Sequence, residues 1–134
     1  MTNQRDLDYL KTFHELAHEL LTSDSIQEMF DKVVLSVTRR LNGFDCGIYI
    51  LEPSTKSLSC QSYYHQNEKQ LLDSKIIHSI NVGEGIIGKS VASKKTLLVS
   101  DVSSCPFYIK NNSDIGSELS VPIMESSNLL GVID

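Results

Sequence analysis

The segment "NVGEGIIGKSVASKKTLLVSD", residues 81–101, decides between two folds. Its three glycines spell G-x-G-x-x-G, and Asp101 follows at about the distance where a dinucleotide-binding fold places its ribose-binding acid. That fold needs a parallel first strand buried on both faces, which reads as a continuous apolar run. The residues just before the glycines, "IIHSINV" at 76–82, instead interleave polar side chains with apolar ones.

A corner between a sheet and a helix explains these glycines better. A parallel crossover needs about thirty residues, whereas only a short helix at 85–94 precedes "TLLVSD". Gly83 and Gly85 allow a sharp turn at positive φ, and Gly88 lets the helix lie close to the sheet. Glu84 would repel a pyrophosphate but suits the first turn of a helix, where it meets the positive end of the dipole. We therefore predict an antiparallel sheet with no nucleotide at this corner.

Two amphipathic helices open the chain. The first covers residues 6–21, and its apolar residues repeat at spacings of three and four, as in a coiled-coil seam. The second begins at Ile26 after an S-x-x-E capping box and ends at Asn42-Gly43. The seam residues of the first helix are Leu10, Phe13, Ala17 and Leu20.

After the second helix the apolar period changes to that of strands. "FDCGIYIL" and "SLSCQSYY" predict a hairpin over residues 44–64, followed by a polar connection with a short helical turn and a strand at 76–82. "ELSVPIM" directs Leu119, Val121 and Ile123 inward, and "LLGVID" begins a last strand. Two helices followed by mostly antiparallel strands, with one or two short helices inserted, indicate an α+β domain.

The composition restricts the class of protein. The chain has 134 residues, enough for one domain, and a formal net charge of -5, which disfavours nucleic acid and anionic membranes as partners. It contains no apolar run long enough to span a bilayer and no secretory signal, so we expect a cytoplasmic protein. Its cysteines, Cys46, Cys60 and Cys105, form neither a disulfide framework nor a zinc pattern.

Taken together, these segments resemble a GAF domain, the small-ligand sensory module of cyclic-nucleotide phosphodiesterases, phytochromes and bacterial signalling proteins. The resemblance runs from about Leu7 to Asp134 and rests on the combination of the glycine corner, "FDCGIYIL", "ELSVPI", "LLGVID" and the two leading helices. It implies an antiparallel sheet of about six strands, with the N-terminal helices on one face. The other face would hold a ligand pocket, covered by the 85–94 helix and the loop at 101–116.

The resemblance implies that residues under and within this cover contact a small ligand. Each polar or aromatic candidate has a structural alternative. Phe107 and Tyr108 can plug the loop onto the core, and Asp101 can cap the loop. His78 can be an ordinary strand histidine, and Tyr64 can simply end a hairpin. The candidate ligand-binding residues are Tyr64, His78, Ile87, Asp101, Phe107, Tyr108 and Ser120.

The cofactors known from this family lack their motifs here. No cysteine is followed by the histidine of a bilin site, the N-K-F-D-E string of cyclic-nucleotide-binding members is absent, and only His65 and His78 stand near a haem position. Free methionine sulfoxide reductases of this family group several cysteines around the pocket. Here only Cys105 lies in the cover, with no nearby cation to stabilise its thiolate.

No catalytic or metal-binding constellation assembles from the remaining residues. There is neither a nucleophile elbow nor an H-E-x-x-H motif. His14 and His18 share a helix face at metal-ligand spacing, but the neighbouring Glu15 and Glu19 indicate a solvated surface. We therefore predict no catalytic residue, no metal and no enzyme.

The chain is predicted to be a single GAF domain over residues 1–134, cut before the C-terminal helix that family members usually carry. Residues 1–22 are expected to form a homodimer through the helix seam. The predicted function is that of a sensor, which binds a small molecule and signals through the dimer helices to an output domain of a longer parent chain. Two alternatives remain: a dimerisation scaffold with a filled pocket, and a redox enzyme of the free methionine sulfoxide reductase type.

Overall fold

A computed structural model of the chain describes residues 3–41, 44–110 and 115–134. Its strands form one antiparallel sheet in the order β3-β2-β1-β7-β6-β5, and the short β4 pairs with β2 beside that path. The predicted α+β class is confirmed. The elements are α1 (Gln4–Leu21), α2 (Ile26–Arg40), β1 (Cys46–Glu52), β2 (Ser57–His65), β3 (Gln70–Leu72), the 3-10 helix η1 (Ser74–Ile76), β4 (Ile80–Asn81), α3 (Gly85–Ser93), β5 (Leu97–Val99), the 3-10 helix η2 (Val102–Ser104), β6 (Glu118–Glu125) and β7 (Asn128–Ile133).

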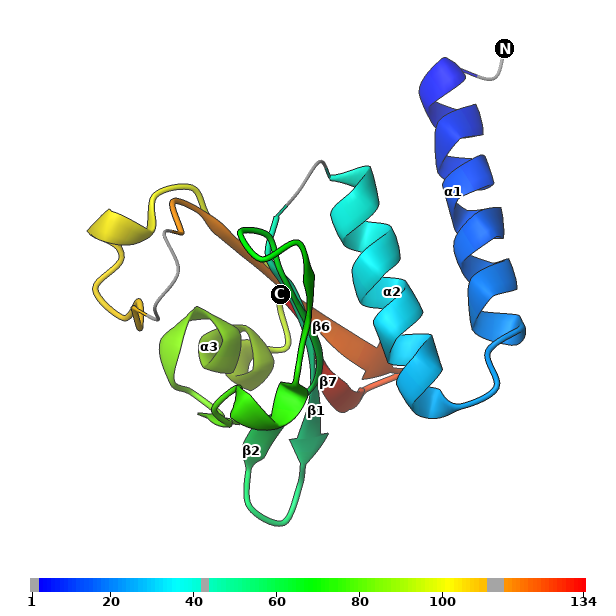
Figure 1. Cartoon of the computed structure of the whole chain (residues 1–134). Coiled ribbons are helices and arrows are strands. Elements are labelled where there is room, and N and C mark those ends of the chain that lie inside the picture. The colour runs from blue at the N-terminus through cyan, green and yellow to red at the C-terminus, as the bar shows by residue number, and fades with distance from the viewer. Residues whose placement is uncertain (1–2, 42–43, 111–114) are drawn as a thin grey trace.

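The helices cover both faces of the sheet, as the resemblance implies. α2 packs on β1 and β2, and α1 packs on the outer side of α2 (Figure 1). α3 lies on the opposite face, next to β6 and β7 (Figure 1). The sheet therefore has an α2 face and an α3 face, and these two names are kept below.

The second helix begins as its sequence predicts. The Ser25 side chain accepts the Glu28 backbone N–H at 3.1 Å, and the Glu28 carboxylate accepts the Asp24 N–H at 2.7 Å. The first bond satisfies a donor that the first turn of a helix leaves free, and the second ties the first turn to Asp24, the residue before the cap. α2 ends at Arg40; the predicted stop at Asn42-Gly43 lies outside the described residues.

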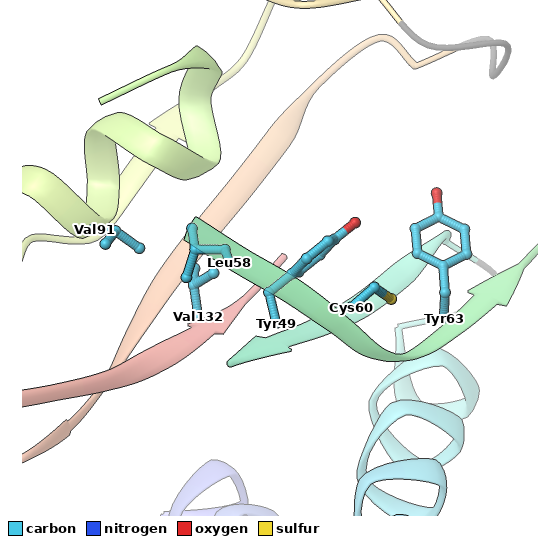
Figure 2. Close-up of a cluster of buried hydrophobic side chains, with 6 residues drawn as sticks. All are labelled: Tyr49, Leu58, Cys60, Tyr63, Val91 and Val132. Carbon is cyan, nitrogen blue, oxygen red and sulfur yellow. The ribbon is translucent and has the colours of Figure 1, made fainter. Parts of the chain in front are cut away.

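Side-chain alternation divides the apolar residues of the sheet into two cores. On the α2 face, Val34 packs with Cys46 and Ile48 of β1. A register shift in the β1–β2 pairing, after Ile48, keeps the two strands in step across an extra residue in β2. The core on the α3 face, drawn in Figure 2, consists of Tyr49, Leu58, Cys60, Tyr63, Val91 and Val132.

Three details of the predicted strands are wrong. The strand expected at 76–82 shrinks to β4, because Asp73 accepts the Lys75 N–H at 3.0 Å and starts η1 instead. The connection before it, predicted as polar with a helical turn, contains β3. Leu119 was expected to point inward, but it lies exposed on the α2 face beyond the area that α2 covers, whereas Val121 and Ile123 are half-buried.

The glycine segment is a corner, as predicted. Gly83 and Gly85 have positive φ, at 92° and 65°. A Cβ on Gly88 would lie 2.5 Å from the Asn81 carbonyl oxygen, so α3 reaches β4 only because this position has no side chain. β4 pairs antiparallel with β2, and β5 antiparallel with β6. The parallel neighbours that a dinucleotide fold requires are therefore not formed by these segments.

Candidate functional site

A row of residues from four strands crosses the α3 face of the sheet. Asp134, directly after β7, exchanges two backbone hydrogen bonds with Gly47 of β1, at 2.8 and 2.9 Å. Tyr63 of β2 lies opposite Gly47 on the other side. On β6, the Ser120 hydroxyl donates to the Asp134 carboxylate. We call Tyr63, Gly47, Asp134 and Ser120 the cross-strand row.

A second carboxyl group lies beside this row. Glu118 is two residues before Ser120 on β6, so its side chain points to the same face of the sheet. Glu118 and Asp134 interact directly, and we call them the acid pair. Burial, followed by the negative charge of Asp134, raises the pKa of Glu118 to about 8. Burial also raises the pKa of Asp134, to about 6, against the opposing effect of its hydrogen bonds with Ser120 and Glu118.

Burial and the repulsion between the two carboxylates therefore make the acid pair keep a proton to a higher pH than an isolated carboxyl group would. No lysine, arginine or histidine of the described residues lowers the pKa of either acid. Both ion pairs found in the described part of the chain, Lys32–Glu28 and Arg40–Glu15, belong to the helices of the α2 face. Neither of these two ion pairs therefore involves the acid pair.

Two tyrosines rise over Gly47 beside the acid pair. A Cβ at Gly47 would lie 2.8 Å from a ring carbon of Tyr49 and 2.9 Å from one of Tyr63, so the two rings meet where this strand has no side chain. Both rings stand on the same side of the sheet (Figure 2). The Tyr63 hydroxyl donates to Asp45 at 3.0 Å. Burial is the main cause that raises the pKa of Tyr49, and the charges of Asp134 and Glu118 add to it.

Residues 101–110 of the loop after β5 bring Tyr108 beside this region, and we call them the lid. Its buried Val102 anchors η2. Lys89 of α3 places its Nζ 5.0 Å from the centroid of the Phe107 ring, which joins the lid to the helix. Tyr108 is half-buried, and its pKa is raised by burial and then by the charges of Glu118 and Asp134. The lid therefore brings a tyrosine close to the acid pair.

The structure brings together two of the seven predicted site residues. Tyr108 and Ser120 both lie at the acid pair. Ile87 is close by on α3, where it packs against the core of the α3 face. Phe107 lies in the lid against Lys89. These four residues lie on or between the sheet, α3 and the lid.

The other three predicted residues lie elsewhere or have another role. Asp101 accepts the Ser103 N–H at 3.0 Å and caps η2, the structural role that its position also predicted. Tyr64 packs on the α2 face, because it is one residue further along β2 than Tyr63. His78 is exposed between η1 and β4, in the segment where the strand was wrongly predicted.

Sequence reasoning missed the acid pair, Gly47 and the two tyrosines above it. A signal for Glu118 was present, because Leu119, Val121 and Ile123 were assigned to one face of their strand. Glu118 and Ser120 must then point to the other face. Their closeness to Asp134 and Tyr49 depends on which strands pair, which this local pattern does not determine.

The cysteines offer no activated nucleophile in the strands. Burial raises the pKa of both Cys46 and Cys60 to about 12, so these thiols stay neutral and poorly nucleophilic. Cys105 is half-buried in the lid. Within residues 3–41, 44–110 and 115–134, no three His, Cys, Asp or Glu side chains gather as a metal site would require. No helix in these ranges is long and apolar enough to cross a membrane.

An open groove of about 480 Å³ lies on the other side of the molecule, between α1 and α2. Charged side chains form its walls, and Arg40 spans it with hydrogen bonds to Glu15 and to Thr12, at 2.5 and 3.1 Å. Its charges are thus partly matched within the groove, in contrast to the acid pair. The residues that line it are Glu15, Glu19, Ser36, Arg39 and Arg40.

The acid pair predicts an unusual dependence of stability on pH. Because the folded pKa of Glu118 is about 8 and its ordinary value is 4.5, the folded state keeps a proton that the unfolded state has lost between these values. Stability must therefore fall as pH rises through this window. Glu118→Gln, which cannot ionise, should lose less stability than wild type between pH 5 and pH 8 in urea unfolding. Glu125→Gln, an exposed change at the other end of β6, should follow wild type; equal slopes for all three proteins would show that Glu118 does not hold the proton.

Comparison with known proteins agrees with the fold described above. A free methionine-R-sulfoxide reductase from Neisseria meningitidis, solved with its substrate, superimposes with a TM-score of 0.77 at 17% identity, over 99% of this chain and 75% of that one. The GAF domain of a phosphoenolpyruvate-protein phosphotransferase from Coxiella burnetii gives a TM-score of 0.82 at 21% identity, over 95% of this chain and 76% of that one. Similarity at these identities concerns the fold alone.

Sequence comparisons identify the family. GAF domain-containing protein A of Dictyostelium discoideum is 36% identical over 55 residues, which are 41% of this chain and only 35% of that protein. The sequence model of the GAF domain matches residues 23–134, from just before α2 to the acid that ends the cross-strand row. The chain therefore belongs to the GAF domain family, which supports a sensory or regulatory module.

Proposed function

We propose that this domain binds a small molecule between the α3 face of the sheet, α3 and the lid, and that it reports this binding through its N-terminal helices. The observation that carries the proposal is the acid pair: two interacting carboxyl groups on neighbouring strands, with no cation beside them among the described residues. A negative charge that is buried without a partner costs free energy. A ligand that donates hydrogen bonds to the acid pair would reduce this cost and so bind favourably.

The lid suits a site that must admit and release a ligand. It is attached by a buried valine and by the contact between Lys89 and Phe107, while Tyr108 extends toward the acid pair. A ligand that touches both the strands and Tyr108 would favour the closed arrangement through its differential affinity. The proposal assigns no chemical reaction to the site, since the strand thiols are buried and neutral.

A thermal-shift screen of a metabolite library tests the ligand proposal. A true ligand should raise the melting temperature further as its concentration increases. At a hundred times its Kd it should add about 2.7 kcal/mol to the free energy of unfolding. Tyr108→Ala should abolish the shift, whereas Leu130→Ala, an exposed leucine of β7, should retain it. If no compound shifts wild type, the domain is a scaffold with a filled site.

The signal from a bound ligand would pass through β2, because this strand carries Tyr63 of the cross-strand row and also contacts α2. Its Tyr63 belongs to the cross-strand row, and the next residue back, Ser62, donates from its hydroxyl to Asp31 of α2 at 2.7 Å. Gln27, also on α2, donates to the Gln61 carbonyl at 2.7 Å. α2 is thus hydrogen-bonded to the strand that carries a site tyrosine, and α1 packs on α2. A ligand-induced shift of β2 would reach the outer helix through these contacts.

The outer helix is the proposed dimer interface. Leu10 and Phe13 are 63% and 73% exposed, because α1 packs on α2 through a different side. Both residues belong to the predicted seam, and the same residues of a second chain would cover them. Sedimentation velocity should show a dimer at tens of micromolar, which Phe13→Glu converts to a monomer. Lys11→Glu, a charge change on another side of the same helix, should leave the dimer intact; a monomeric wild type would contradict the proposal.

A further inference from the structure

We propose that the ligand of this site carries a protonated amine, which the acid pair and the Tyr49 hydroxyl receive together. The inference rests on the proposed function and names the class of molecule that the site takes. It is independent of the lid's motion and of the dimer. Three observations carry it: the position of the Tyr49 hydroxyl, the absence of a described cation at the acid pair, and the aromatic walls.

Tyr49 is a buried residue with an unused polar atom. Its side chain is only 4% exposed, yet its hydroxyl makes no hydrogen bond with any described residue. Fully enclosed side-chain nitrogen and oxygen atoms of the described residues all have partners. The Tyr49 hydroxyl must therefore be reachable from outside the core. Hydroxyls that are buried to this extent usually have a partner, so a bound molecule is the natural one here.

The hydroxyl points toward the acid pair. It lies 3.3 Å from the position of a Cβ on Gly47, and Gly47 is the residue that exchanges both backbone hydrogen bonds with Asp134. The negative charges of Asp134 and Glu118 also contribute to the raised pKa of Tyr49. A group bound above Gly47 thus meets the phenol oxygen and the carboxylates at once. All three can accept a hydrogen bond, and an ammonium group offers three donors and no acceptor.

The electrostatics select the sign of the ligand's charge. An anion would add to the negative charge of Asp134, whereas a cation would offset it and stabilise Glu118 in its ionised form. The charged group of α3, Lys89, is directed to the Phe107 ring rather than to the acids. Among the described residues, the titratable groups of other segments whose pKa is raised by the charge of the acid pair are a thiol and two phenols: Cys46, Tyr49 and Tyr108.

The walls suit an amine with an apolar body. Tyr49 and Tyr108 lie close enough to the acid pair for its negative charge to raise their pKa. Tyr63 meets Tyr49 over Gly47, and aromatic faces attract cations. Toward α3 the surface becomes apolar, with Ile87 and Val91. The structure therefore favours a compact primary amine attached to an apolar or aromatic group, with the nitrogen at the strands and the body under α3.

Three matched probes test the class directly: phenethylamine, 2-phenylethanol and 3-phenylpropanoate, titrated into the purified chain and followed by NMR. Because charge-assisted hydrogen bonds are about twice as strong as neutral ones, the amine should bind at least roughly tenfold more tightly than the alcohol. The carboxylate should not bind. Equal affinity for amine and alcohol, or preference for the carboxylate, would overturn the inference.

Proton release provides a second readout. A bound ammonium lowers the pKa of Glu118, so the acid pair should release up to one proton on binding. Calorimetry at pH 7 in two buffers of different ionisation enthalpy measures this proton. The affinity for the amine should rise from pH 5.5 to pH 8.5, as Asp134 and then Glu118 ionise. An affinity independent of pH, with no proton released, would contradict the role of the acid pair.

Two near-isosteric variants locate the amine. Glu118→Gln removes the ionisable acid and should weaken amine binding roughly tenfold and abolish proton release. Tyr49→Phe keeps the ring over Gly47 and should weaken binding several-fold while proton release persists. Glu125→Gln serves as the control, and melting curves confirm that each variant folds.

The amine inference and the proposed function can fail separately. If the metabolite screen finds neutral or anionic ligands and phenethylamine does not bind, the amine class is wrong and the sensor function stands. If neither the screen nor the three probes bind, the sensor function itself is wrong. If phenethylamine binds but neither Glu118→Gln nor Tyr49→Phe weakens it, the amine is received elsewhere and the inference fails.

Discussion

Replacing Gly131 with alanine should destabilise the domain by about 3 kcal/mol or more. Gly131 lies in β7 opposite Ile50 of β1, in the middle of the sheet. A Cβ there would overlap the Tyr49 carbonyl oxygen and lie 3.2 Å from the Ile50 Cα. These are backbone atoms of a paired strand, so they cannot move aside without breaking the β1–β7 ladder.

Urea unfolding measures the effect, and Gly116→Ala is the matched control. Nothing lies within 4 Å of a Cβ at Gly116, and its backbone φ is not in the left-handed region. The control should therefore unfold within about 0.5 kcal/mol of wild type. A Gly131→Ala protein of wild-type stability would mean that β1 and β7 do not approach each other as closely as described. The folded fraction of this variant should also lose ligand binding, because Tyr49 and Asp134 belong to these two strands.

Gly88→Ala should be the most damaging of the three alanine changes at the glycine corner, at about 2 kcal/mol or more. Its Cβ would lie 2.5 Å from the Asn81 carbonyl oxygen and 3.0 Å from the Gly83 nitrogen, both backbone atoms. The new methyl group must push the first turn of α3 away from β4. Because α3 forms one wall of the proposed site, ligand affinity should fall together with stability.

The other two corner glycines provide the comparison. Gly83→Ala meets no atom within 4 Å, so it should cost only the strain of its φ of 92°, about 1 kcal/mol. Gly85→Ala combines a φ of 65° with a 3.2 Å approach to a terminal carbon of Ile109, a side chain that can move. Urea unfolding of all three variants should therefore rank Gly88→Ala as the least stable. A different rank would show that backbone conformation, rather than close packing, decides the corner.

Much of this fold could be predicted because its signals are local. The capping residues of α2, the alternation of Cys46, Ile48 and Ile50, and the glycine corner each depend on neighbours within a few residues. The strand at 76–82 failed for the same reason. A nearby cap at Asp73 competes with the alternating pattern, and propensity alone does not show which prevails.

The candidate site could be predicted only in part, because it is assembled by long-range pairing. Ser120 and Tyr108 could be named as candidates because they lie in segments that resemble the family. Glu118 and Asp134 are unremarkable acids at strand ends until the β6–β7 register brings them together. In the sequence, Tyr49 has the pattern of an ordinary core residue. The structure shows that the Tyr49 hydroxyl occupies the space left by the missing side chain of Gly47.

The strand order determines at which stage of folding the proposed site can form. The β1–β2 and β6–β7 hairpins form from neighbours in sequence, but the cross-strand row spans the junction between them, where Gly47 meets Asp134. Contacts between residues so far apart along the chain close slowly during folding, since a long loop must first be ordered. The proposed site would thus be completed by the closure of this junction, and a ligand held there would delay its opening.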